Sequence, residues 1–159
     1  MSQENVEQQY RAADAFSSHD LDAFLAICDD DIELVSRHLE LEGSGHLRGH
    51  AAVRRWWETL LCVYPDFTSE IEEVRDLGDV TIARHHFRGQ GVESGAQLEQ
   101  RHWQVTRWRN NKAVWWRSLP TEAEALEVAA GLPEQDARTG SPAPSHSAGG
   151  GAATLPPPR

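Results

Sequence analysis

The sequence predicts an α+β domain in which helices come first and a sheet of antiparallel strands follows. Apolar residues recur at helical spacing in the first third of the chain, whereas strand-like alternation dominates residues 68–119. Strong turn signals, Gly78-Asp79 and Asn110-Asn111, separate these later segments. The chain also holds six tryptophans, more than a core of this size needs, which indicates that some of them line a ligand cavity.

Three helices are expected before the main strands. The first has apolar side chains at helical spacing, namely Val6, Tyr10, Ala13 and Phe16. Ser18 or Asp20 can cap a second, short helix over residues 21–28. A third helix is predicted from about residue 50 to 63, where Pro65 prevents its continuation.

The strands are predicted from alternation and turn signals. The first strand, beginning near residue 32, has even-numbered side chains on one face, namely Ile32, Leu34, Ser36 and His38. Four more strands are expected over residues 68–77, 80–89, 96–109 and 113–119. The Glu-rich segment 121–130 then predicts a final helix, with Thr121 as its N-cap.

The folded body is expected to span residues 3–132, followed by a disordered tail over 133–159. The tail holds six of the eight prolines and almost no large apolar residues, so it cannot bury a core. Its LPPPR ending could adopt polyproline II and bind a partner, but a solvated tail is the favoured interpretation.

Charge and composition exclude several classes of function. The net charge is −10, and residues 1–42 carry −9 of it, which argues against nucleic-acid binding. A basic, aromatic segment at residues 101–117 is the competing indication of a platform for single-stranded nucleic acid. Cys28 and Cys62 are predicted to be buried reduced thiols, since their spacing suits neither a metal site nor a redox pair.

No membrane span and no secretory signal is apparent, so a cytoplasmic location is expected. Fourteen arginines against one lysine suggest a bacterial source with a GC-rich genome.

Four segments, in order and at matching spacing, resemble the SnoaL-like branch of the nuclear transport factor 2-like superfamily. They are residues 19–34, 49–57, 78–89 and 105–114. The resemblance implies a cone formed by a curved antiparallel sheet wrapped around three helices, with a central pocket at one end. It also implies a homodimer formed through the sheet.

The family includes ketosteroid isomerases, polyketide cyclases, epoxide hydrolases and non-catalytic binding domains, so the residues must decide the activity. By resemblance, the isomerase general base falls at Ser36 and its neutral acid near Gln104. The acid of the epoxide-hydrolase pattern falls at Ser118. Neither a hydroxyl nor an amide replaces a carboxylate near neutral pH, so steroid isomerisation and epoxide opening are both disfavoured.

Histidines take the place of carboxylates at the predicted cavity face. Strand alternation puts His85 and His86 on opposite faces, so the two cannot ligate one metal, and no metal or other cofactor is expected. A turn centred on Glu93-Ser94 would set His85 directly across from His102. Two facing imidazoles disfavour double protonation, so at least one would be neutral and could act as a base. The alternative is that both merely hydrogen-bond a ligand or each other.

The remaining predicted cavity residues come from the helices and from the same strand faces. They are Phe16, Ser36, His38, Trp56, Trp57, Phe87, Gln104, Trp108 and Trp116.

The last hairpin leaves two registers open. A two-residue Asn110-Asn111 loop turns Trp115 and Arg117 inward, whereas a bulged turn with Asn111 left-handed turns Trp116 and Ser118 inward. The resemblance favours the bulge, and the outward tryptophan would then mark an exposed aromatic patch at a dimer interface.

These observations favour a cofactor-independent cyclase, isomerase or dehydratase that acts on a hydrophobic, polycyclic or aromatic carbonyl compound. His85 and His102 would be its acid/base pair. The alternative is a non-catalytic ligand-binding or dimerisation module with the same fold.

Overall fold

The structure, a computed structural model, describes residues 2–35 and 46–133. The predictions for Ser36, His38 and the tail concern residues outside these ranges. The helices are α1 (Ser2–Ser17), α2 (Leu21–Ile27), α4 (His50–Val63) and α5 (Glu122–Gly131). The strands are β1 (Cys28–Val35), β2 (His46–Arg48), β3 (Thr68–Asp76), β4 (Val80–Gln90), β5 (Gln97–Arg109) and β6 (Lys112–Leu119). All the predicted helices and strands are present. The short strand β2 was not predicted.

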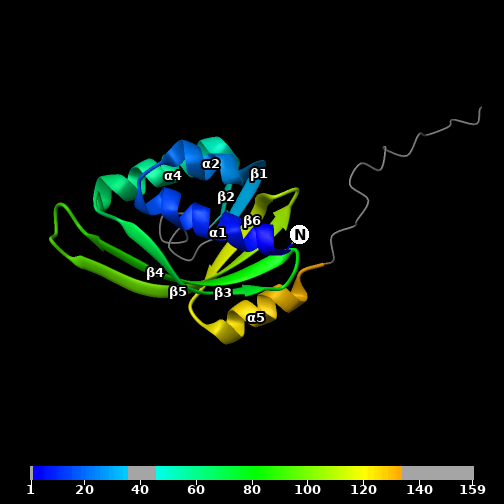
Figure 1. Cartoon of the computed structure of the whole chain (residues 1–159). Helices are drawn as coiled ribbons and strands as arrows, with labels where there is room; N and C mark the ends of the chain where they lie inside the picture. Colours follow the sequence, from blue (N-terminus) through cyan, green and yellow to red (C-terminus); the bar gives the residue numbers. More distant parts are fainter. Residues whose placement is uncertain (1, 36–45, 134–159) are drawn as a thin grey trace, which may run out of the picture.

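The strands form one curved sheet in the order β2-β1-β6-β5-β4-β3. Helices α1, α2 and α4 lie against one face of this sheet, and α5 lies against the other (Figure 1). The α+β cone is therefore confirmed. The sheet is mixed, however, because β1 runs parallel to β6, and the prediction of a wholly antiparallel sheet was wrong in this respect. Side-chain alternation is the same in both directions, so it carries no information on this pairing.

Two caps hold the short helices as expected. Asp20 accepts a hydrogen bond from the Ala23 backbone N–H at 3.0 Å and thereby caps α2. Thr121 does the same for α5, accepting from the Glu124 N–H at 3.2 Å. Each cap satisfies a backbone donor that the first turn of a helix leaves without a partner.

The β4–β5 hairpin closes symmetrically about Glu93 and Ser94. Gln90 pairs with Gln97 at its tip, and the ladder continues to His85 opposite His102. This register was predicted, and it is confirmed.

The β5–β6 hairpin combines the two alternatives that the sequence left open. Asn110 and Asn111 have φ angles of 51° and 61°, and Arg109 pairs with Lys112, so the connection is a two-residue turn with both asparagines left-handed. The extra residue lies further along β6, because Trp108 pairs with Ala113 but Arg107 pairs with Trp115, which leaves Val114 as a bulge.

This bulge determines which tryptophan faces the helices. Trp116 lies in the core cluster under α1, α2 and α4, whereas Trp115 packs toward α5. The inward position of Trp116 and Ser118 is confirmed. The expectation of an exposed aromatic patch is not, because Trp103 is only 8% exposed and Trp115 is half-buried, both in the cluster that includes Ala125 of α5.

Helix α1 buries a polar face that the apolar spacing did not predict. Tyr10 is 45% exposed, whereas Asn5, Gln8 and Gln9 are buried. The Asn5 amide donates to the Gly78 carbonyl, and the Gln8 amide donates to the Asn111 carbonyl, each at 3.0 Å. These bonds attach α1 to the two turns that end the main hairpins.

The cysteines differ from each other. Cys28 is buried as expected, but Cys62 on α4 is exposed, so its predicted burial was wrong. Within the described ranges, no helix is long and apolar enough to cross a membrane.

Candidate ligand cavity

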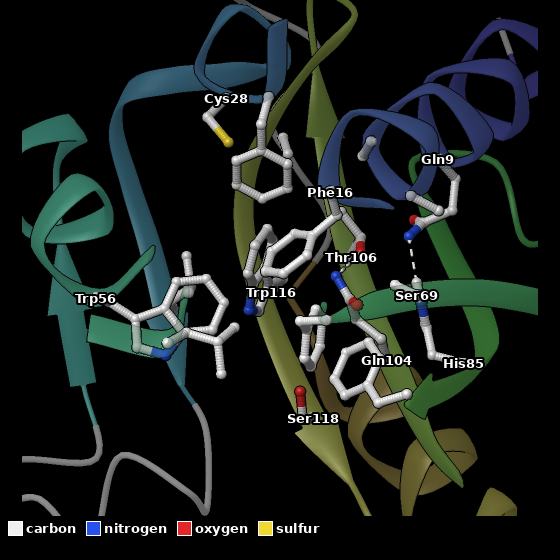
Figure 2. Close-up of a pocket in the computed structure, with 18 of the residues that line it drawn as sticks. Gln9, Phe16, Cys28, Trp56, Ser69, His85, Gln104, Thr106, Trp116 and Ser118 are labelled. Carbon is white, nitrogen blue, oxygen red and sulfur yellow. Dashed lines mark hydrogen bonds between the residues drawn. The ribbon is translucent and has the colours of Figure 1, made fainter. Parts of the chain in front are cut away.

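A cavity of about 370 Å³ lies between helices α1, α2 and α4 and the concave face of the sheet. This is near the lower end of the range for small-molecule sites. Figure 2 shows side chains from helices and strands converging on it. The predicted cavity residues that line it are Phe16, Trp56, His85, Phe87, Gln104, Trp108 and Trp116.

Aromatic rings form one side of the cavity. Trp56 lies 5.7 Å from Phe16 and 6.3 Å from Trp116, measured between ring centroids. Phe24 contacts Trp116 edge-to-face at 5.3 Å. Such packing gives a rigid apolar wall that suits the flat face of a ring system.

Trp57 has a different position from its neighbour Trp56. It is 2% exposed, is not among the lining residues, and packs against Phe16 and Phe24 at 4.2 and 5.1 Å. Adjacent residues on a helix point about 100° apart, so one tryptophan reaches the cavity while the other fills the core.

A chain of buried hydrogen bonds forms the opposite, polar side. The Trp108 indole N–H donates to the Thr81 hydroxyl at 2.9 Å, and this hydroxyl donates to Gln9 Oε1 at 3.0 Å. Gln9 Nε2 lies 3.4 Å from His85 Nε2, and His85 Nδ1 lies 3.0 Å from the Ser69 hydroxyl. Gln9, Ser69 and His85 all line the cavity, and the three are grouped together in Figure 2.

The direction of this chain is set by the Gln9 amide, whose oxygen faces Thr81 and whose nitrogen faces His85. An indole nitrogen can only donate, so the Thr81 oxygen accepts from it, and the Thr81 hydroxyl donates to Gln9 Oε1, the amide oxygen that faces it. The amide nitrogen of Gln9 therefore faces His85 Nε2, which must accept. The remaining proton of a neutral His85 ring lies on Nδ1 and is donated to Ser69 Oγ.

Burial keeps this imidazole neutral. His85 is 4% exposed, and desolvation lowers its pKa from 6.5 to about 4. At neutral pH the ring is therefore an uncharged donor to Ser69, with its acceptor nitrogen occupied by the Gln9 amide.

His102, the second predicted acid/base residue, lies beside His85 but is not among the lining residues. The two rings are nearly parallel, with an interplanar angle of 8° and centroids 5.4 Å apart. Phe87 packs on His102 at 4.2 Å and itself lines the cavity. The structure thus brings the two histidines together, but only His85 reaches the cavity.

His86 points away from the cavity, as alternation predicted. Its ring lies 3.1 Å from Glu99 Oε1 and 3.0 Å from an Arg88 guanidinium nitrogen on the other face of the sheet. Across residues 2–35 and 46–133, no cluster of His, Cys, Asp or Glu could hold a metal ion.

The cavity has no ionised side chain among the described residues that line it: none is Asp, Glu, Lys or Arg. Its thiol is also uncharged, because burial raises the pKa of Cys28 to about 12. Burying an unpaired charge in such surroundings is costly, so the cavity is suited to uncharged molecules.

Sequence reasoning missed Gln9 and Ser69. Gln9 could have been found, since it follows Asn5 by four residues and precedes Ala13 and Phe16 by four and seven, which puts all four on one helical face. Ser69 carries no such signal, because a lone serine early in a strand is indistinguishable from a solvent-facing one.

The fold and the cavity define a small-molecule pocket protein of cone-shaped α+β architecture. The family model described as a SnoaL-like domain matches residues 6–116, more than half of the chain, and the chain therefore belongs to this family. No curated protein was found to match the sequence.

Solved structures with the same fold agree with this assignment. An NTF2-like protein of unknown function from Burkholderia pseudomallei has 20% identity and a TM-score of 0.67, covering 78% of this chain and 95% of that one. TerC, co-crystallised with polyporic acid, has 17% identity and a TM-score of 0.66, covering 80% and 98%. IdmH from Streptomyces antibioticus, for which a polyketide cyclase role has been suggested, has 17% identity and a TM-score of 0.63, covering 80% and 99%. At these identities the likeness concerns the fold alone.

Proposed function

We propose that this protein binds an uncharged, largely apolar small molecule, an aromatic or polycyclic carbonyl compound, in the cavity beneath α1, α2 and α4. The observation that carries the proposal is the composition of the wall, where aromatic rings lie opposite a few neutral polar groups and none of the described lining residues is ionised. The fold shared with TerC, which was crystallised with polyporic acid, supports a small organic ligand but not its charge.

The experiment compares two probes of nearly the same shape, 9-fluorenone and its 4-carboxylate, by quenching of tryptophan fluorescence. The neutral ketone is expected to bind at least about tenfold more tightly at pH 7, because the described part of the cavity wall offers no cation to compensate a buried carboxylate. Absence of binding by the ketone, or equal binding of the two probes, would refute the proposal.

A second candidate function is acid–base turnover of such a ligand, as in a cofactor-independent cyclase, isomerase or dehydratase. The observation that favours it is the neutral imidazole of His85 in the cavity wall, with a contact to Gln9 of 3.4 Å that is long for a hydrogen bond. If that contact opens, Nε2 becomes a base. A pKa of about 4 makes it a weak base, so only a C–H acidified by a neighbouring carbonyl is within its reach.

This candidate can be tested without knowing the substrate. The aromatic ketone 2-tetralone exchanges its α-hydrogens in D₂O, and catalysis by His85 would accelerate the exchange measured by proton NMR. His85→Ala should then return the rate to the uncatalysed value while 2-tetralone still binds. Equal rates with and without the protein would leave ligand binding as the function.

The homodimer through the sheet remains a proposal that is supported by the family resemblance. Helix α5 covers the outer face near Trp103, so the outer surface of β3–β5 beyond it is the part left for a partner. This surface carries ion pairs, such as Arg101 with Glu72 at 2.7 Å. Sedimentation velocity on the full chain and on Arg101→Glu tests the proposal: a dimer that the substitution weakens is expected, and a monomeric wild type would refute it.

A further inference from the structure

The Ser69 hydroxyl ends the buried hydrogen-bond chain, and its proton has no acceptor in that chain. Its oxygen accepts from His85 Nδ1 at 3.0 Å, and the hydrogen bonds between Ser17 and Ser69 use the Ser69 backbone, not its hydroxyl. Ser69 is 6% exposed and lines the cavity. A buried hydroxyl normally donates as well as accepts, because an unused donor costs about 1–3 kcal/mol. The acceptor must therefore come from the contents of the cavity.

The Ser69–His85 contact superficially matches the pairing of a nucleophilic serine with its base. In that arrangement the imidazole accepts the serine proton. Here the direction is the opposite, because the Gln9 amide has its oxygen toward Thr81 and its nitrogen toward His85, so that the neutral ring accepts at Nε2 and donates at Nδ1. The ring holds the Ser69 oxygen in place and does not activate it.

We propose that the Ser69 hydroxyl, held by the imidazole of His85, is the hydrogen-bond donor that recognises an acceptor oxygen of the ligand. The cavity would thereby select carbonyl compounds over the corresponding hydrocarbons. This inference rests on the proposed binding function and deepens it, since it assigns the polar contact and its direction. In Figure 2, Ser69 and His85 lie on the side of Phe16 away from Trp56, so a ligand ring would lie toward the tryptophans and its oxygen toward Ser69.

The test compares the binding of 9-fluorenone with that of fluorene, which has a CH₂ group in place of the carbonyl. The wild type is expected to bind the ketone about fivefold to tenfold more tightly than the hydrocarbon, the ratio that one net hydrogen bond gives. Ser69→Ala should abolish this preference and leave fluorene binding within about twofold, and Ser69→Thr, which keeps the hydroxyl, should retain it.

Ser118 is the alternative hydrogen-bond donor, because it also lines the cavity, and Ser118→Ala is therefore the matched control. Loss of the preference in Ser118→Ala but not in Ser69→Ala would overturn the inference. So would a preference that survives Ser69→Ala. If neither probe binds the wild type, the proposed function itself fails. If both bind equally, only the inference fails.

A second measurement does not depend on a variant that must fold. The infrared C=O band of 9-fluorenone bound to the wild type should lie below its position in an apolar solvent, because the carbonyl accepts a hydrogen bond. An unshifted band would overturn the inference.

Discussion

His85 and His102 lie directly opposite each other on β4 and β5 with nearly parallel rings, yet only His85 forms part of the cavity wall. The pair that the sequence indicated therefore exists, but its members differ in role. His85 belongs to the polar chain that ends at Ser69, whereas His102 stacks behind Phe87. A mechanism in which both imidazoles touch one ligand does not fit this arrangement.

The burial of His85 predicts a loss of stability in mild acid. Its pKa is about 4 in the folded state and about 6.5 when unfolded, so between these values the unfolded chain takes up a proton that the folded chain does not. Stability should fall as pH is lowered from about 6.5 to 4, by about 2 kcal/mol at pH 5 relative to pH 7.5 for this residue alone. Urea unfolding of the wild type and His85→Gln at both pH values measures it. A variant with the same pH dependence as the wild type would contradict the assignment.

The adjacent tryptophans should separate binding from stability. Trp57→Ala is expected to cost about 3–5 kcal/mol of stability, since it leaves a hole in a packed core. Trp56→Ala, which removes half-buried cavity wall, should cost less stability but weaken 9-fluorenone binding about tenfold or more. Urea midpoints and fluorescence titration provide the two readouts. Equal stability losses would show that both rings serve the core.

The last hairpin turn should be sensitive to the residue at position 111. Asn111 has a φ of 61°, a conformation that costs about 1–2 kcal/mol for residues with an ordinary side chain and almost nothing for glycine. Asn111→Ala is expected to destabilise by about 1 kcal/mol, whereas Asn111→Gly should be neutral or slightly stabilising. Thermal unfolding of the three proteins checks this order. The Asn111 carbonyl that accepts from Gln8 is kept in both variants.

The two thiols should react very differently. Cys62 is exposed, whereas Cys28 is buried with a pKa raised to about 12, so it has almost no thiolate at pH 8. Ellman's reagent should therefore modify one thiol per native chain quickly and the second only after unfolding. Cys62→Ser identifies which one reacts first. Rapid labelling of that variant in its native state would contradict the described burial of Cys28.

The parts of this molecule that follow from local rules were accessible from the sequence. Turn chemistry at Gly91–Gly95 and strict alternation in β4 and β5 sufficed to pair His85 with His102. Caps such as Thr121 and the end of α4 before Pro65 were equally direct.

What the sequence did not predict depends on contacts distant along the chain. The buried amides of Asn5 and Gln8 look solvent-exposed on any hydrophobicity scale, and only the turns that they bind explain their burial. Likewise, Ala113 to Trp116 is apolar on both faces, so alternation could not locate the bulge at Val114. The family resemblance correctly predicted that Trp116 faces inward. The extra residue, Val114, lies in the strand and not in the turn.

The unpaired residue Val114 in β6 determines whether a charged side chain faces the ligand cavity. If Val114 were paired as an ordinary strand residue, the parity of the strand beyond it would invert, and the guanidinium of Arg117 would occupy the side now taken by Ser118. The cavity wall would then carry a positive charge, which would favour anionic ligands. The kind of molecule that this scaffold accepts thus depends on one residue of β6 being left out of the strand pairing.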